Sequence, residues 1–238
     1  MASDLLAAFA HPDDETFAVG GTLHRYAARG VALVCATRGG AGRTSGVDVA
    51  GPADVARVRE AELHAATAIL GIRRVVLLDH PDGGLAQVDA DILVAQVVRA
   101  IRAERPRVML TFGPEGAPTQ HRDHRAISRA ATAAFFLAGI ATALPEAGVP
   151  HRADRLLYLT WATPRPDDEL QAQGLPADVV IDIAPSRDAK WRAFLAHRSQ
   201  RHHEARFRAL SLERDELFAL GAGTPFPSRP ATDLFAGL

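Results

Sequence analysis

The chain has 238 residues, 47% of them hydrophobic and 23% charged, and its 27 basic and 28 acidic residues give a formal net charge of −1. This length and apolar content suffice for a substantial core and argue against wholesale disorder, while near-neutrality excludes a global field that draws the chain onto nucleic acid or anionic lipid. The single cysteine, Cys35, excludes an internal disulfide, and no apolar stretch reaches the roughly 18 residues of a membrane span, so we expect a cytoplasmic protein.

Short apolar runs alternate along the chain with longer amphipathic segments that end at glycine or proline. In chain order, this pattern predicts strand 5–10, helix 17–30, strand 31–37, loop 39–51, helix 52–70, strand 75–78, helix 91–105 and strand 108–112. It then predicts a segment 121–138 that starts as a loop and becomes a helix, strands 156–161 and 179–183, helix 188–203 and an irregular tail from about residue 221. Strands that alternate with helices indicate βαβ units. We therefore expect a single α/β domain over residues 1–238, with a mostly parallel sheet covered by helices on both faces.

A histidine and three consecutive acids follow the first predicted strand, in the segment from His11 to Glu15. Ligands of open parallel sheets bind at the carboxyl ends of strands, so this segment has the position of a site. His11 and Asp14, three residues apart across a turn that Pro12 restricts, can converge on one cation, with Asp13 pointing toward the same centre. The alternative is that Asp13 or Asp14 caps the next helix, but capping accounts for one carboxylate only.

A second histidine-rich segment, His121-Arg122-Asp123-His124, follows the fourth predicted strand. Two histidines three residues apart at the start of a helix share one face, so one of them can bind a metal while the other faces substrate. Zinc accepts histidine nitrogen and aspartate oxygen, and a catalytic zinc site usually has three protein ligands and one open place. Calcium and magnesium prefer more oxygen ligands, whereas iron, cobalt and nickel stay open as alternatives.

Five segments, in this order, together resemble the LmbE-like, or PIG-L, de-N-acetylase family across roughly residues 4–200. They are Ala10–Glu15, Arg59 with Glu62-Leu63, Pro81-Asp82-Gly83, His121–His124 and His197–Gln200. The resemblance implies a Rossmann-like sheet and a hydrolase that removes an N-acetyl, or more generally an N-acyl, group from an amino-sugar substrate such as an N-acetylglucosamine conjugate. The expected partner is thus a small molecule, and the oligomeric state, a homo-oligomer included, is left open.

The resemblance also implies roles for the site residues. It places Zn²⁺ on His11, Asp14 and His124, with another divalent transition metal such as Fe²⁺ left open. Zinc lowers the pKa of a bound water to about 7. Asp13 is then expected to act as general base toward that water, and His121, as an imidazolium, to stabilise the oxyanion and protonate the departing amine.

Three further residues have two interpretations each. Arg59 and Asp82 are expected from the resemblance to contact substrate, but a solvated charged helix face explains Arg59 and an ordinary turn explains Asp82 equally well. Asp123 is expected either to orient a histidine through its second ring nitrogen or to be a solvated helix cap. His197 has no assigned role.

Two other functions and one variant compete with the deacetylase. The variant is an amidase that acts on a thiol conjugate. The first competitor is a non-catalytic, Rossmann-like module that binds a metal or small molecule, although no Gly-x-Gly-x-x-Gly follows the first strand. The second is a nucleic-acid-binding protein, suggested by the arginines of residues 187–214. Acidic residues interleave with these arginines, so we expect a mixed helix surface and no nucleic-acid partner.

Overall fold

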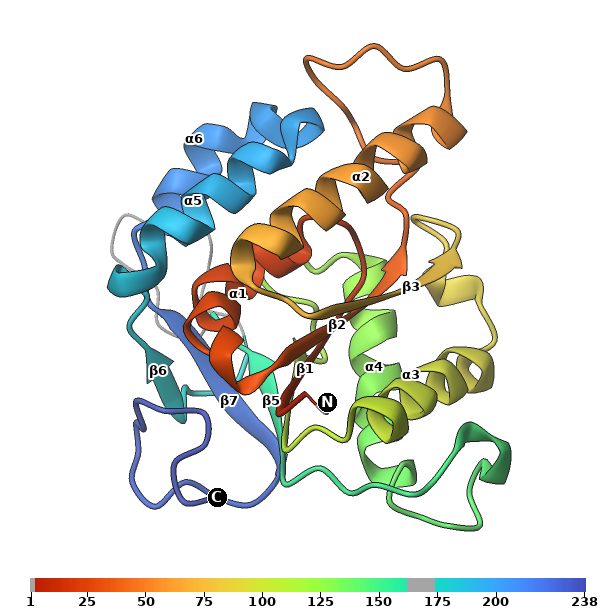
Figure 1. Cartoon of the computed structure of the whole chain (residues 1–238), viewed down its shortest axis with the longest axis vertical. Coiled ribbons are helices and arrows are strands. Elements are labelled where there is room, and N and C mark those ends of the chain that lie inside the picture. The colour runs from red at the N-terminus through yellow and green to blue at the C-terminus, as the bar shows by residue number, and fades with distance from the viewer. Residues whose placement is uncertain (1–2, 162–173) are drawn as a thin grey trace.

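The computed structural model describes residues 3–161 and 174–238, whose strands form one seven-stranded sheet in the order β3-β2-β1-β4-β5-β7-β6 (Figure 1). The strands β1 to β5 are parallel, and β7 runs antiparallel between β5 and β6. Their bounds are β1 Leu5–Phe9, β2 Val31–Thr37, β3 Arg74–His80, β4 Val108–Phe112, β5 Arg155–Leu159, β6 Val179–Ile181 and β7 Glu216–Gly223. This confirms the predicted mostly parallel α/β sheet.

Helices cover both faces of the sheet (Figure 1). Helices α1, α2 and α5 pack on one face, and α3 and α4 pack on the other. The helices are α1 Asp14–Arg25, α2 Pro52–Leu70, α3 Ala90–Glu104, α4 Arg122–Leu137, α5 Arg187–Ala196 and α6 Glu204–Phe207, and a π-helical turn at Arg208–Leu212 follows α6. Among the described residues, none of these helices combines the length and the apolar character that crossing a membrane requires.

The strand order reverses between β1 and β4, which are neighbours in the centre of the sheet. The chain leaves β1 toward β2 on one side and leaves β4 toward β5 on the other. The loops that follow two such strands diverge and leave a crevice at the carboxyl edge of the sheet, where ligands of open α/β sheets bind. The segments from His11 and from His121 both start at this edge.

Two helices differ from their predicted bounds by more than one residue. Helix α1 begins at Asp14, three residues before the predicted start, since Asp14 and Glu15 occupy its first turn, where acidic side chains oppose the helix dipole favourably. The helix predicted over 188–203 is α5 only to Ala196, followed by 3₁₀ turns over Arg198–His203. The backbone of His197 leaves the helical region there, because His197 and Ser199 bond to buried acids of other elements.

The predicted irregular tail is partly wrong, because β7 extends to Gly223. A Cβ atom on Gly221 would lie 2.6 Å from the Tyr158 ring, so the close packing of β7 on β5 requires glycine at this position. Glycine is uncommon inside strands, which is why the composition of this segment did not predict one. Beyond β7 the tail contains no helix or strand, apart from a bridge at Ala231. The fully buried Arg155 guanidinium holds this tail by donating to four of its backbone carbonyls, including that of Leu234.

A buried ion pair joins β7 to α1 and α5. Lys190, the sole lysine of the sequence, lies 2.6 Å from the Glu216 carboxylate, and both side chains are at least 96% buried. Glu216 also accepts the backbone N–H groups of Gly21 and Thr22, just past a break in the helical geometry of α1 at Val19. The carboxylate thus supplies acceptors to donors that the interrupted helix leaves free.

Replacement of this lysine is expected to destabilise the fold. Lys190→Met leaves Glu216 as a buried charge without its cation, which typically costs about 3–5 kcal/mol. Urea unfolding measures this loss of unfolding free energy. Arg192→Met, which removes an exposed guanidinium paired with Asp188 on the same helix, is the control and is expected to change stability by less than about 1 kcal/mol. Equal stabilities of the two variants contradict the prediction.

Candidate active site

Two imidazoles and one carboxylate meet at the carboxyl ends of β1 and β4. His11 Nδ1 lies 3.3 Å from Asp14 Oδ2, and His124 Nε2 lies 3.3 Å from Asp14 Oδ1. All three residues are at least 91% buried. The structure therefore brings together the three predicted metal ligands, although His124 is far from the other two in the sequence.

The ionisable groups of this cluster shift one another's pKa values because they lie close together. Burial acts to raise the pKa of Asp14, but His124 and His11 outweigh burial and hold that pKa well below its usual value. Burial likewise acts to lower the pKa of His11, yet its bonds to Asp123 and Asp14 hold the pKa well above the usual value. A proton on His11 thus supplies positive charge that the neighbouring carboxylates require, and a bound cation can replace this proton.

The donor set fits a transition-metal ion of the zinc type. Two imidazole nitrogens and one carboxylate oxygen are ligands that zinc accepts, and three protein ligands leave a place open. Among the described residues, two trios place one ligand atom of each member within 4.8 Å of the others: His11, His121 and His124, and His11, Asp82 and Asp123. The geometry alone thus makes His121 an alternative to Asp14 as the third ligand, but His121 is exposed whereas Asp14 is buried.

Asp123 fixes the orientation of the His11 ring. Its fully buried carboxylate lies 3.3 Å from His11 Nε2 and accepts the backbone N–H groups of Gly83 and Leu85. A proton held on Nε2 by this contact leaves Nδ1, which faces Asp14, free to bind a metal. The alternative interpretation of Asp123 as a solvated helix cap is wrong, because its side chain has no exposure to solvent.

Asp13 lies beside the cluster in a strained backbone conformation. Its φ of 113° is in the left-handed region, and its side chain makes no cap bond to α1, so helix capping does not explain it. Asp13 lines a cavity together with Asp14 and His124. Burial raises the pKa of Asp13 to about 6, the Arg59 guanidinium opposes this rise, and Asp14 adds to it. A carboxylate with a raised pKa at a cavity is suited to proton transfer near neutral pH.

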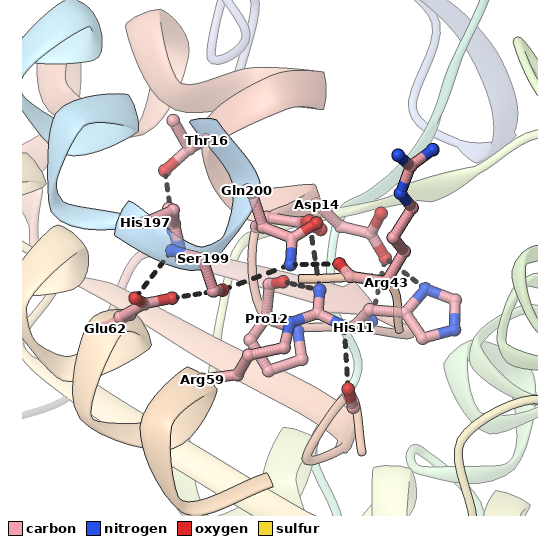
Figure 2. A network of polar contacts seen from close by, with 12 residues as sticks. His11, Pro12, Asp14, Thr16, Arg43, Arg59, Glu62, His197, Ser199 and Gln200 are labelled. Carbon is pink, nitrogen blue, oxygen red and sulfur yellow. Dashed lines mark hydrogen bonds and ion pairs between the residues drawn. The ribbon is translucent and has the colours of Figure 1, made fainter. Parts of the chain in front are cut away.

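Arg59 lies under the first motif instead of on an exposed helix face. It is 4% exposed and donates to the carbonyl oxygens of Pro12 and Gly39, and its Nη2 lies 3.0 Å from Asp13 Oδ2 (Figure 2). The interpretation as a solvated charged face is therefore wrong. The guanidinium fixes the turn that carries the histidine and the acids, while its contact with substrate stays a prediction.

Loss of the Arg59 guanidinium is expected to lower the stability of the fold and to shift the acidic limb of the activity profile to higher pH. Arg59→Met leaves the Asp13 carboxylate without its buried cation, which we expect to cost about 3 kcal/mol of unfolding free energy. Because Arg59 holds the pKa of Asp13 down, its loss raises that pKa, and a base that works ionised then loses activity at a higher pH. Urea unfolding and a pH profile of kcat/KM measure these effects, and Arg59→Lys is expected to restore part of both. An unchanged acidic limb contradicts the electrostatic part.

His121 caps α4 near the two predicted histidine ligands. Its Nδ1 accepts the backbone N–H of Asp123, and its ring centroid lies 4.8 Å from that of His11. Burial, then His11 and His124, lower the pKa of His121, which favours the neutral imidazole over the predicted imidazolium. With Nδ1 as acceptor, the proton resides on Nε2, which can donate a hydrogen bond.

Asp82 also turns toward the cluster. Its Oδ1 lies 3.2 Å from His11 Nε2, and its Oδ2 accepts the backbone N–H of Ala41. Burial acts to raise the pKa of Asp82, but His11 outweighs burial and lowers it, so the side chain is ionised. An ordinary turn residue has no such contacts. Its role in substrate binding stays a prediction.

Two buried contacts to which sequence analysis assigned no role support the first turn of α1 and the centre of α2. His197 Nε2 lies 2.7 Å from Glu15 Oε1, and Glu15 in turn accepts the backbone N–H of Asp13. Glu62 accepts both the backbone N–H and the hydroxyl of Ser199 (Figure 2). The segment 197–200 thus braces Asp13 through Glu15, and its likeness to a family motif was the signal that pointed to it.

The chain is similar to known proteins over most of its length. The family model described as PIG-L, GlcNAc-PI de-N-acetylase, matches residues 6–135, more than half of the chain. The chain belongs to the PIG-L family. This family match covers both histidine-containing segments, the Arg59 helix and Asp82.

Curated relatives of this PIG-L protein are named as deacetylases. One, from Rhodococcus opacus (strain B4), is a 1D-myo-inositol 2-acetamido-2-deoxy-alpha-D-glucopyranoside deacetylase, 33% identical over 82% of this chain and 81% of its own. Another, from Bacillus cereus (strain ATCC 14579), is a probable N-acetyl-alpha-D-glucosaminyl L-malate deacetylase 2, 32% identical over 84% of each chain. The PIG-L protein is accordingly an amide-hydrolysing enzyme.

Solved structures agree on the fold. The N,N'-diacetylchitobiose deacetylase from Pyrococcus horikoshii has a TM-score of 0.75 and 18% identity, with 92% of this chain and 84% of that chain covered. The conserved protein TT1542 from Thermus thermophilus has a TM-score of 0.72 and 29% identity, with 95% and 99% covered. The mostly parallel sheet with helices on both faces is thus shared with these proteins.

Proposed function

We propose that this enzyme is a metal-dependent N-deacetylase of N-acetylglucosamine conjugates, with a zinc ion, or another divalent transition metal such as Fe²⁺, held by His11, Asp14 and His124. The observation that carries the proposal is the buried convergence of these three side chains beside Asp13, which lines a cavity together with Asp14 and His124. The names of the relatives from Rhodococcus and Bacillus support the substrate class.

When bound, the metal would supply a Lewis acid that activates water and polarises the acyl oxygen. The chain's own groups then perform the proton transfers. Asp13 accepts a proton from the attacking water as the water oxygen bonds to the acyl carbon. The C–N bond breaks, and the proton that Asp13 holds passes to the departing nitrogen, so that the products are a free amine and acetic acid, which ionises to acetate by releasing the second proton of the water.

Four residues assist these steps. His121 donates a hydrogen bond from Nε2 to the acyl oxygen as negative charge develops on it, which is worth about 2.7–4 kcal/mol in comparable sites. Asp123 keeps the His11 ring in the tautomer that leaves Nδ1 free. Arg59 keeps Asp13 in place, and Asp82, ionised at the edge of the cluster, is proposed to accept a hydrogen bond from a sugar hydroxyl.

The proposal is tested by amine release from a panel of N-acetyl sugars. The purified protein, loaded with Zn²⁺ or anaerobically with Fe²⁺, is incubated with N-acetylglucosaminyl inositol, N-acetylglucosaminyl malate, diacetylchitobiose and free N-acetylglucosamine. We expect free amine and acetate in equal amounts from at least one of the glucosaminyl conjugates, and no release after chelation of the metal. Absence of release from the whole panel, with metal bound, would reject the deacetylase and favour a binding module.

A further inference from the structure

An apolar cavity of about 200 Å³ opens directly beside the proposed catalytic groups. Asp13, Asp14 and His124 are among the residues that line it. The rest of its wall is largely hydrophobic and comes from α1, the end of β4, the segment after β5 and the π-helical turn: Phe17, Ala18, Phe112, Trp161 and Leu210. The sequence predicted no functional role for any of these residues, and the proposed proton transfers use none of them.

The polar substrate-binding candidates are not among the residues that line the cavity. Asp82 and His121 face His11, and neither they nor His11 line the cavity. An amide substrate carries two substituents, here a sugar on the nitrogen and an acyl chain on the carbonyl carbon. Sugar hydroxyls need hydrogen-bonding partners, whereas an acyl chain gains free energy by leaving water for an apolar wall. The cavity therefore matches the acyl side of the amide.

The volume exceeds what an acetyl group needs. An apolar cavity of about 150 Å³ holds benzene, a molecule of six carbons, whereas an acetyl group offers a single methyl. We propose that this cavity is an acyl-chain subsite that makes the enzyme prefer N-acyl groups of about four to six carbons over N-acetyl, with Phe17, Trp161 and Leu210 determining the chain length. This inference rests on the proposed amide hydrolysis of glucosaminyl conjugates.

A series of substrates that differ only in the acyl chain tests the subsite. Glucosaminyl inositol is acylated on nitrogen with acetyl, butanoyl, hexanoyl or decanoyl, and kcat/KM for amine release is measured with the Zn²⁺-loaded enzyme. Each methylene buried in the cavity is expected to raise kcat/KM about fourfold. We expect butanoyl and hexanoyl to exceed acetyl by about tenfold or more, and decanoyl to fall below hexanoyl because it outgrows the cavity.

The outcomes separate the subsite from the reaction itself. Release from the acetyl substrate with a decline at every longer chain overturns the subsite and leaves the deacetylase intact. Release from none of the substrates rejects both. Arg206 and His203 also line the cavity and could favour an anionic group there. An N-succinyl substrate, which resembles butanoyl in length but ends in a carboxylate, is therefore also measured. Faster cleavage of succinyl than of butanoyl assigns the cavity to an anionic group and overturns the proposal.

Variants of Leu210 change the cavity in opposite directions. Leu210→Trp fills it and is expected to lower the ratio of hexanoyl to acetyl kcat/KM about tenfold or more, whereas Leu210→Ala enlarges it and is expected to move the optimum toward decanoyl. Ile140→Trp, at an exposed position past the end of α4, is the control and is expected to leave the ratio unchanged. If either Leu210 variant is folded, by its melting temperature and near-UV circular dichroism, and keeps the wild-type chain-length profile, the assignment is wrong.

Discussion

Asp13→Asn is expected to lower kcat for amine release by about 10²- to 10⁴-fold, the usual contribution of a positioned general base. The amide cannot take the proton of the attacking water, and it nearly matches the carboxylate in size, so the strained turn keeps its shape. Metal content is expected to stay at the wild-type level, because Asp13 is not among the proposed ligands. Steady-state kinetics and metal analysis of the same preparation measure both quantities.

Asp91→Asn provides the matched control for this substitution. Asp91 is an exposed residue in the first turn of α3, away from the candidate site, so its kcat is expected to equal that of the wild type. A metal-loaded Asp13→Asn protein with a kcat close to that of the wild type would remove the general-base role. Loss of the metal from that variant would instead make Asp13 a ligand.

Asp14→Asn is expected to weaken metal binding more than about 100-fold, which exceeds the effect of removing a residue that merely orients a ligand. The amide lacks the negative charge that His124 and His11 stabilise, and its nitrogen cannot coordinate the ion as an oxygen does. His121→Ala is expected to keep the metal while losing activity. Competition with a chromophoric chelator measures the affinity of each variant for Zn²⁺.

This pair of variants decides which residue completes the ligand set. His11, His121 and His124 are close enough to form a trio without Asp14, so loss of metal in His121→Ala, with binding retained in Asp14→Asn, would replace the proposed site by the three-histidine one. His64→Ala removes an exposed imidazole from α2 and is expected to change neither affinity nor activity. Asp123→Asn is expected to lower the affinity for Zn²⁺ about 10- to 100-fold, an effect smaller than that of Asp14→Asn and larger than that of His64→Ala.

The sequence was sufficient to predict the position of the site because two kinds of local pattern coincided. Apolar runs 5–10 and 108–112 predicted buried parallel strands, and each was followed by a histidine-containing segment. Since parallel strands end at one edge of the sheet, the two segments had to meet if those strands were neighbours, and β1 and β4 are. The family resemblance predicted that these two strands are neighbours, whereas the periodicity of the sequence alone does not predict which strands pair.

The environments of individual charged side chains could not be predicted in the same way. Arg59 has Arg57 and Glu60 as near neighbours, a composition that is typical of an exposed helix face, yet it is buried under Pro12. Its burial depends on the course of the loop after β2, where a Cβ atom on Gly39 would lie 2.4 Å from the guanidinium. The close approach of backbone and side chain is a tertiary property and has no local signal.

The strand β7 was missed for a related reason. Its residues Glu216–Gly223 contain two glycines and a buried acid, whereas strand prediction relies on β-branched and aromatic residues. Glu216 is buried because Lys190 and two backbone N–H groups of α1 contact it, and neither partner is near it in the sequence. The break of the last predicted helix at His197 similarly follows from its bond to Glu15.

The contact between Glu216 and α1 has a consequence for the order in which the enzyme is completed during synthesis. The helix that begins at Asp14 leaves the ribosome well before the carboxylate that satisfies Gly21 and Thr22, because Glu216 follows these two residues by 195 and 194 positions. A nascent polypeptide that stops before β7 therefore holds both histidine-containing segments without the partner that stabilises the middle of this helix. We therefore expect the site to be fully stabilised only after β7 has been translated and has inserted between β5 and β6.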